Sequence, residues 1–332
     1  MSDVAIKAGV SEKSVSRVVN GEPHVSAALK SKVNQAIEAL GYVPDLAARS
    51  LAGSRSFMVS LLFDTRGPQY AARLLEGAYD ACEASGYHLR VENLDSLADI
   101  DSLLGRLEQI LRNSRLDGMV LTPPFCDQRE IMALLEERSI PFSRVAPFVD
   151  PGRSPAAFID DGTAAAQVAD LLLGYGHRRI GLVNGPPEHG AAVARRNGFL
   201  RRVREAAPDA EITEVDGNFL FEGGREAGHA LLSAERRPTA IFAANDDSAA
   251  GLMSVCSELG ICVPDDLSVC GFDDSWTARS VWPYLTTIHQ PVDEIARAAT
   301  RLLIEKPEDP DDPQQVKLAH RLVERNSVRR LD

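Results

Sequence analysis

The run DVAIKAGVSEKSVSRVVNG, residues 3–21, predicts two short helices joined by a tight turn. Gly9 suits the turn because it adopts backbone conformations that other residues avoid, and Ser11 can cap the second helix. At helical spacing the valines of the second helix fall on one side, where they can pack against Val4, Ala5 and Ala8. We therefore predict a helix-turn-helix motif.

The same spacing leaves a polar outer face on the second helix. Arg and Lys side chains can donate to guanine, Glu can accept from cytosine, and Ser can bond a phosphate or a base edge. The candidate DNA-binding residues of this face are Ser11, Glu12, Lys13, Ser16 and Arg17. The alternative is a small helical hairpin whose polar face is merely solvated, so the motif alone does not decide between them.

The net charge of −12 argues against DNA binding until it is divided along the chain. Residues 1–55 hold seven Lys and Arg against five acidic residues, so this part carries +2. The remaining residues hold 29 basic and 43 acidic side chains and carry −14. We expect weak non-specific affinity for DNA, with operator binding that depends on base contacts and dimerisation.

Length and composition favour a soluble protein of two or three domains, because the chain has 332 residues and 44% of them are hydrophobic. No apolar run reaches the roughly 20 residues that span a bilayer, and no secretory signal is evident. We expect a cytoplasmic protein without a membrane partner. The five cysteines lack metal-type spacing, so we interpret them as reduced structural thiols and expect neither a metal site nor a cofactor.

From residue 56 onward, buried-type strands alternate with amphipathic helices in two successive runs. The expected strands are 57–63, 87–92, 116–122, 140–145, 180–184, 211–215, 240–244 and 267–271. The expected helices are 70–85, 97–113, 129–138, 164–173, 193–206, 224–233 and 248–259. This order predicts two doubly wound parallel sheets, and ligands bind such sheets at the carboxyl ends of the strands.

Polar residues gather where the cleft between the two halves should lie. Asn245 and Asp246 follow one strand, Asp273 and Asp274 follow another, and Arg195 comes after a glycine-proline loop. Carboxylates, an amide and a guanidinium suit the vicinal hydroxyls of a sugar. The aromatic candidates for the apolar sugar face are Phe219, Tyr70 and, more weakly, Trp276. The alternative for each aspartate is capping of the next helix, which applies best to Asp246 and Asp274.

The motifs VSRVVN, HVS and GYVPDLAARSLA follow one another along the chain. The LacI/GalR family of bacterial transcription regulators has these motifs in the same order, and the chain resembles this family. The resemblance implies further DNA contacts at Asn20, His24 and Ser26. It also implies a hinge helix over residues 45–55. In this helix Leu51 would wedge into the minor groove, with Ala48 beside it. Arg49 and Arg55 would contact phosphates. In the family a few residues precede the motif, whereas here Met1-Ser2 stand directly before Asp3. We therefore expect an upstream start or a trimmed chain.

Later motifs extend the resemblance over nearly the whole chain, among them GHRRIGLVNGP, AANDDSAAGLM, SVCGFDDS and LTTIHQP. The resemblance implies a periplasmic-binding-protein-like body in which the chain crosses between subdomains near Ala157, Ile288 and Lys317. The effector-binding residues that it implies, together with those from the polar pattern, are Arg195, Asn245, Asp273, Phe219, Gln290, Tyr70, Asp64 and Asp160.

We therefore expect four parts: a DNA-binding head (residues 1–44), the hinge helix (45–55), an N-subdomain (56–157 and 289–316) that dimerises, and a C-subdomain (158–288 and 317–332). The candidate dimer face is the apolar side formed by Leu74, Leu75, Ala78 and Cys82, and ordinary core burial is the alternative for each of them. No leucine heptads indicate a tetramer.

The expected function is a homodimeric regulator, in the first place a repressor of carbohydrate uptake or catabolism genes, which binds a palindromic operator and is switched by a sugar-like effector. A solute-binding protein of the periplasmic type is one alternative, and a regulator that senses a purine is another. An enzyme is not expected, because the sequence has no phosphate loop, no G-x-S-x-G elbow and no opposed acid pair.

Overall fold

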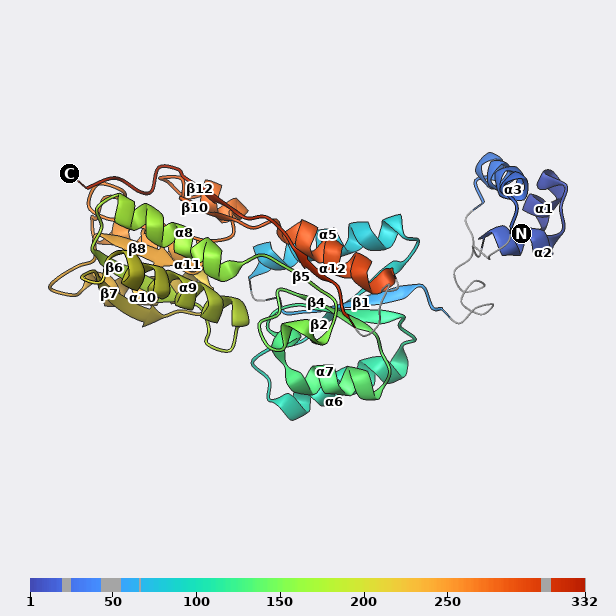
Figure 1. Ribbon diagram of the computed structural model, residues 1–332, viewed down its shortest axis with the longest axis horizontal. Coiled ribbons are helices and arrows are strands. Elements are labelled where there is room, and N and C mark those ends of the chain that lie inside the picture. The colour runs from blue at the N-terminus through green and yellow to red at the C-terminus, as the bar shows by residue number, and fades with distance from the viewer. Residues whose placement is uncertain (20–24, 43–54, 66, 306–311, 332) are drawn as a thin grey trace. The chain divides into compact units, whose positions relative to one another are not determined.

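The computed structural model describes residues 1–19, 25–42, 55–65, 67–305 and 312–331. The chain folds into two compact units, Met1–Phe57 and Met58–Asp332, which we call the head and the body (Figure 1). No helix in the described ranges is long and apolar enough to cross a membrane.

The described part of the head contains three helices, α1 (Ser2–Ala8), α2 (Glu12–Val19) and α3 (Ala27–Leu40). Gly9 ends α1 with a φ of 64°, and the Ser11 hydroxyl accepts the Ser14 amide at 3.2 Å, which is the cap that the sequence predicts. Val4 and Val15 are fully buried and pack together with Val33 of α3. The helix-turn-helix prediction is confirmed, because the apolar faces meet and the polar face of α2 points outward.

The first half of the body, which we call the N-subdomain, is built on six parallel strands in the order β11-β5-β4-β3-β1-β2. The strands are β1 (Met58–Phe63), β2 (His88–Asn93), β3 (Gly118–Leu121), β4 (Phe142–Val145), β5 (Ala156–Phe158) and β11 (Gln315–Lys317). Helices α5 (Pro68–Ala84) and α12 (Val292–Ile304) cover one face, and α6 (Ile100–Asn113) and α7 (Arg129–Glu137) cover the other (Figure 1).

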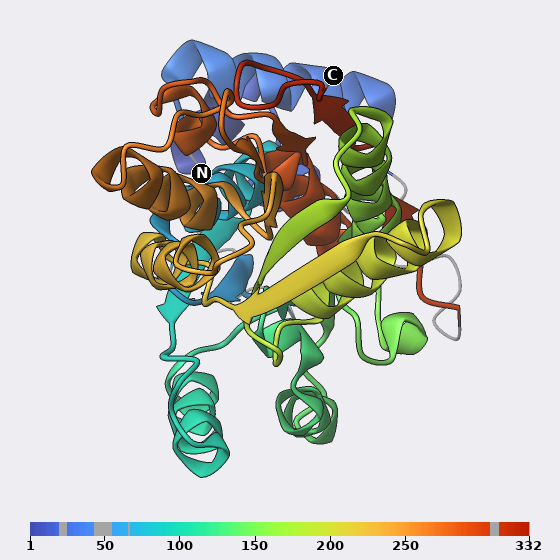
Figure 2. The ribbon, with the colours of Figure 1, turned by 90° about the vertical axis from the view of Figure 1, so that its left-hand side faces the viewer.

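The second half, the C-subdomain, has four parallel strands in the order β7-β6-β8-β9. The strands are β6 (Arg179–Asn184), β7 (Glu211–Asp216), β8 (Ala240–Ala243) and β9 (Ser268–Cys270). In Figure 2, α8 (Asp161–Gly174) and α9 (Gly190–Ala206) lie on one side of this sheet, and α10 (Phe221–Leu232) and α11 (Asp246–Glu258) lie on the other. Short 3-10 turns lie in the described loops of the body, namely η1 (Phe125–Asp127), η2 (Pro151–Arg153) and η3 (Trp276–Arg279).

The chain passes between the two subdomains in three places. It leaves the N-subdomain after β5, returns after β10 (Thr287–His289), and leaves again between β11 and β12 (Arg321–Val323), which pairs antiparallel with β10. The two-subdomain parallel-sheet fold class is confirmed. The short strands β5, β10, β11 and β12 were not expected as elements, because three-residue strands carry too few side chains to show a pattern. Helix α12 was not expected either, although its buried residues have helical spacing.

The helix face that the sequence suggested for dimerisation is buried in the core of the N-subdomain instead. Leu74, Ala78 and Cys82 are at most 2% exposed, and α5 packs so closely on α12 that a side chain at Gly77 would lie 1.9 Å from the Asp293 carbonyl oxygen. The expectation was wrong for these residues because a helix stripe that packs on α12 looks the same in sequence as one that packs on a second chain. All five cysteines are free thiols, and Cys262 differs from the others in being exposed.

Candidate functional site

A cavity of about 90 Å³ lies between the two subdomains, at the carboxyl ends of their strands. The N-subdomain contributes Asp64, Gly67, Tyr70, Leu74, Thr122 and Pro123, and the remaining wall is formed by His189, Ala191, Arg195, Phe219, Asn245, Asp273 and Gln290. Seven of the eight predicted effector-binding residues therefore meet here. This convergence comes from elements far apart in the sequence, as doubly wound sheets require.

Arg195 is held rigidly at the floor of the cavity. Its Nε donates to Asp161 at 2.8 Å, its Nη1 donates to the Ala244 carbonyl at 2.7 Å, and its guanidinium lies 3.7 Å from the centroid of the Phe272 ring. Only 5% of the residue is exposed. A buried guanidinium fixed on several sides presents its remaining donor capacity in one direction, toward the ligand space.

Asp273 supplies the acidic group opposite Arg195, with Oδ1 3.6 Å from the Arg195 Nη1. Its backbone has a φ of 116°, so the turn after β9 directs the side chain into the cavity, and Gln290 donates to Oδ1 at 2.5 Å. Burial raises the pKa of this carboxyl to about 6, although Arg195 and Gln290 oppose the shift. The carboxylate retains acceptor capacity for donors from a ligand.

Asn245 has a double role. Its Oδ1 caps α11 by accepting the Ser248 amide at 3.0 Å, and its Nδ2 donates to the Phe219 carbonyl at 2.7 Å. Phe219 has a φ of 65°, and its ring packs against His189, with the ring centroids 5.4 Å apart. Asn245 therefore positions the aromatic ring as well as lining the cavity.

Tyr70 and Asp64 close the cavity from the N-subdomain. Burial, and next the nearby Asp273, raise the pKa of the Tyr70 hydroxyl, so it stays a neutral donor. Asp64 accepts the Ser96 amide at 3.2 Å, which orients its carboxylate. Sequence reasoning missed His189 and Thr122 as wall residues. Thr122 directly follows β3, but its neighbours along the chain are apolar, and His189 lies in the loop between β6 and α9 without a polar cluster beside it.

Asp160 does not line this cavity, which corrects the expectation from sequence. Its carboxylate caps α8 by accepting the Thr163 amide at 2.9 Å and pairs with Lys317 at 2.8 Å, and this hydrogen bond to Lys317 lowers its pKa to about 2. It faces a separate hollow of about 340 Å³. The neighbouring Asp161 reaches the site instead, because it holds Arg195.

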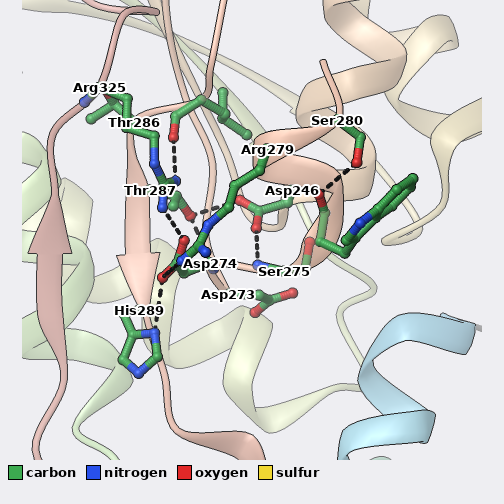
Figure 3. Close-up of polar contacts among 12 residues, drawn as sticks. Asp246, Asp273, Asp274, Ser275, Arg279, Ser280, Thr286, Thr287, His289 and Arg325 are labelled. Carbon is green, nitrogen blue, oxygen red and sulfur yellow. Dashed lines mark hydrogen bonds and ion pairs between the residues drawn. The ribbon is translucent and has the colours of Figure 1, made fainter. Parts of the chain in front are cut away.

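Asp246 and Asp274 do not line the cavity, and both bond neighbouring segments of the chain (Figure 3). Asp246 is fully buried, accepting the Thr287 hydroxyl at 2.6 Å and the Ser275 amide at 2.7 Å, so it is not the helix cap. Asp274 binds Arg325 and, at 3.0 Å, His289. Capping was the alternative for both, and the structure replaces it with bonds that join the loop after β9 to β10 and the C-terminal segment.

The predicted DNA-binding residues are placed only in part. Ser11, Glu12 and Lys13 are exposed, and Ser16 and Arg17 are half-buried on α2. Ser26 caps α3 by accepting the Leu29 amide at 3.3 Å, so its hydroxyl has a structural partner. Five others lie outside the described residues, namely Asn20, His24, Ala48, Arg49 and Leu51.

Two family models match the chain. Residues 1–45 match the bacterial regulatory proteins of the lacI family, and residues 169–328 match a periplasmic binding protein-like domain. The HTH-type transcriptional repressor PurR of Photorhabdus laumondii is 34% identical, with 99% of this chain and 96% of PurR covered.

Solved structures agree with these matches. A complex of the transcriptional regulator CelR with cellobiose is 28% identical with a TM-score of 0.74, and a lac repressor dimer bound to operator and an anti-inducer is 25% identical with a TM-score of 0.77. Each alignment covers 98% of both chains. These relatives are transcription regulators and not enzymes. The chain therefore belongs to the LacI family of DNA-binding bacterial transcription regulators.

Proposed function

We propose that the protein is a repressor that binds palindromic operator DNA as a homodimer and is switched by a small sugar in the cavity between its subdomains. The observation that carries the effector class is the buried pair of Arg195 and Asp273 beside the Phe219 ring. A sugar ring offers hydroxyls that donate to the carboxylate and accept from the guanidinium, and it offers an apolar face to the aromatic ring.

The switch follows from the position of the cavity. Tyr70 comes from the N-subdomain, and Arg195 and Asp273 come from the C-subdomain, so a ligand that contacts all three favours one relative position of the two halves. Effector and operator then bind with a coupling free energy of about 1–3 kcal/mol. The repressor role is supported by relatives that are named transcriptional repressors.

A purine effector is the second candidate, and the similarity to PurR favours it. The aromatic rings of Tyr70 and Phe219 could stack on a planar base, and Asp273 could accept from its ring nitrogens. The sugar proposal rests on geometry instead: the polar side chains of Asp64, Arg195, Asp273 and Gln290, among others, converge on a cavity of about 90 Å³, which suits many hydroxyls on one small ring.

Exposed aromatic residues indicate where a second copy could bind. Trp276, Trp282 and Tyr284 are 72%, 76% and 44% exposed on one loop of the C-subdomain, and Tyr79 on α5 is 55% exposed. The rings of Trp282 and Tyr284 pack edge to face at 5.2 Å. Aromatic residues of this kind are enriched in interfaces, so we propose this loop, together with the outer side of α5, as the dimer contact.

The test is a thermal-shift screen of the full-length protein against monosaccharides, disaccharides, their phosphates and purines. A ligand at 100 times its Kd stabilises the native state by about 2.7 kcal/mol. Operators selected from a random DNA library then report release by fluorescence anisotropy. We expect a sugar to stabilise the protein and release the operator, and both effects to disappear in Asp273→Ala and Arg195→Ala.

Arg201→Ala is the matched control, because Arg201 lies on the same helix with its side chain 66% exposed. It should bind sugar and operator as the parent does. If a purine stabilises the protein and no sugar does, the effector is a purine, which is the second candidate above. If none of the compounds changes the melting temperature, the proposed switch by a small molecule is refuted.

A further inference from the structure

A carboxylate of the N-subdomain reaches a helix of the C-subdomain beside the cavity. Asp127, the last residue of η1, accepts the Phe148 amide at 2.7 Å and the Val149 amide at 2.8 Å, both through Oδ1. Burial raises the pKa of this carboxyl, and hydrogen bonds from the amides of Val149, Phe148 and Gly190 oppose the rise. Gly190 begins α9, so one carboxylate bonds both subdomains. We call the contact of Asp127 and Phe148 with Gly190 the latch.

A side chain at position 190 would not fit into the latch. A Cβ there would lie 2.1 Å from the Phe148 Cβ and 2.5 Å from the Asp127 Oδ2, so Oδ2 is the carboxylate oxygen nearest to Gly190. The two neighbours of Gly190, His189 and Ala191, are walls of the cavity. The latch therefore holds the wall that the start of α9 contributes.

Helix α9 has no N-terminal cap within its own sequence. Its N-cap residue, His189, makes no side-chain cap bond, and its first turn contains no acidic residue. By contrast, α8 and α11 are capped by the residues that precede them, Asp160 and Asn245. An acceptor with negative charge stabilises the start of a helix, and α9 obtains it from Asp127 of the other subdomain.

The N-subdomain side of the latch is held in place by Arg144, which is fully buried. Its Nη1 donates to the Val149 carbonyl at 2.7 Å and to the Cys126 carbonyl at 3.3 Å, and its Nε donates to the Ser154 hydroxyl at 2.8 Å. These bonds fix the residue before Asp127 and the residue after Phe148. When the subdomains separate, the bond to Gly190 is therefore the one that breaks.

We propose that Asp127 is a positioning residue, which closes the cavity by capping α9 across the boundary between the subdomains. Asp127 does not line the cavity, so it acts on a ligand only through the start of α9. The latch itself does not depend on the identity of the effector. Its influence on how fast an effector leaves rests on the proposed function, because the effector is taken to lie between the two subdomains.

The variant Asp127→Asn separates the two halves of the contact. Its carbonyl oxygen can still accept the amides of Phe148 and Val149, whereas its NH₂ group replaces Oδ2 and meets the Gly190 amide as a second donor. Hydrogen–deuterium exchange of the full-length protein without ligand, read by mass spectrometry, measures this. We expect the Gly190 amide to exchange at least about tenfold faster, and the amides of residues 148 and 149 to stay protected.

Asp150→Asn is the matched control. Asp150 lies on the same loop as Phe148, but its carboxylate pairs at 2.6 Å with Arg129, whose side chain is 63% exposed. This variant should leave the exchange of all three amides unchanged. The melting temperature of Asp127→Asn without ligand should stay close to that of the parent, because the bonds within the N-subdomain remain.

The rate at which an effector leaves tests the positioning role. D-glucose, D-galactose, D-ribose, cellobiose and guanine are the probes, and the one that raises the melting temperature most is measured by surface plasmon resonance on immobilised full-length protein. We expect it to dissociate at least about tenfold faster from Asp127→Asn than from the parent and from Asp150→Asn. Gly190→Ala should also accelerate dissociation, because its Cβ forces α9 away from Phe148.

The latch is overturned if the Gly190 amide exchanges equally fast in the parent and in Asp127→Asn. It is also overturned if exchange rises throughout the N-subdomain, since Asp127 would then have a structural role only. A freed Gly190 amide with an unchanged dissociation rate overturns the positioning role. If none of the probes binds, the proposed function fails for these compounds, and the exchange experiment still decides whether the latch exists.

Discussion

Replacing Asp273 with Asn should make the body more stable at neutral pH. Burial raises the pKa of this carboxyl from 3.8 to about 6 in the native state, against an ordinary value in the unfolded chain. The folded protein therefore retains a proton that the unfolded chain has lost, and stability falls as pH rises from about 4 to about 6. The difference between a pKa of 3.8 and one of about 6 corresponds to about 3 kcal/mol, which is lost in full only above about pH 7, where the native carboxyl is fully ionised.

The introduced amide would imitate the protonated acid, because it has the same shape and cannot ionise. Its oxygen can still accept from Gln290, which bonds the corresponding Asp273 oxygen at 2.5 Å in the native protein, and Arg195 keeps its bond to Asp161 at 2.8 Å. The variant should therefore match the parent near pH 4 and exceed it by about 3 kcal/mol near pH 7.5. Sugar binding should be lost at both.

Urea unfolding followed by far-UV circular dichroism at both pH values measures the difference. Asp170→Asn serves as the control, because Asp170 is a carboxylate of the same subdomain whose side chain is 51% exposed and pairs with Arg202. An Asp273→Asn variant that is equally or less stable at neutral pH would refute the reasoning. A gain of the same size at both pH values would also do so, since it could not arise from ionisation.

Three other outcomes are expected. Gly198→Ala should lower the free energy of unfolding by about 1–3 kcal/mol or more, because the new Cβ would lie 2.1 Å from the Gly162 carbonyl oxygen. Gly105→Ala should raise it by about 0.5–1 kcal/mol, because Gly105 lies on α6 with open space around its Cβ position. Urea titration measures both changes. Ser11→Ala should cost α2 about 1 kcal/mol and weaken operator binding in anisotropy without changing sugar affinity. Trp282→Arg should shift the dimer toward monomer in analytical ultracentrifugation and leave the monomer folded, and an unchanged sedimentation coefficient would contradict the proposed contact.

The sequence by itself determined the head motif and the order of most long helices and strands. Long amphipathic helices such as α5 and α9, and strands such as β1 and β6, lie within a few residues of their predicted bounds, because each buries a face whose period is visible in the chain. The turn at Gly9 and the cap at Ser11 depend on neighbours only a few residues away, so they too could be predicted locally.

Only the tertiary structure decided which polar residues act together. Asp160 and Asp161 are adjacent and chemically identical, yet one caps α8 and pairs with Lys317 while the other holds Arg195. The same holds for Leu74. Its spacing in the sequence places it on an apolar helix face, but does not show whether that face packs on α12 or on a second chain. Direction and partner depend on segments far away along the chain, 34 residues for Asp161 and 157 for Asp160, and no local pattern carries that information.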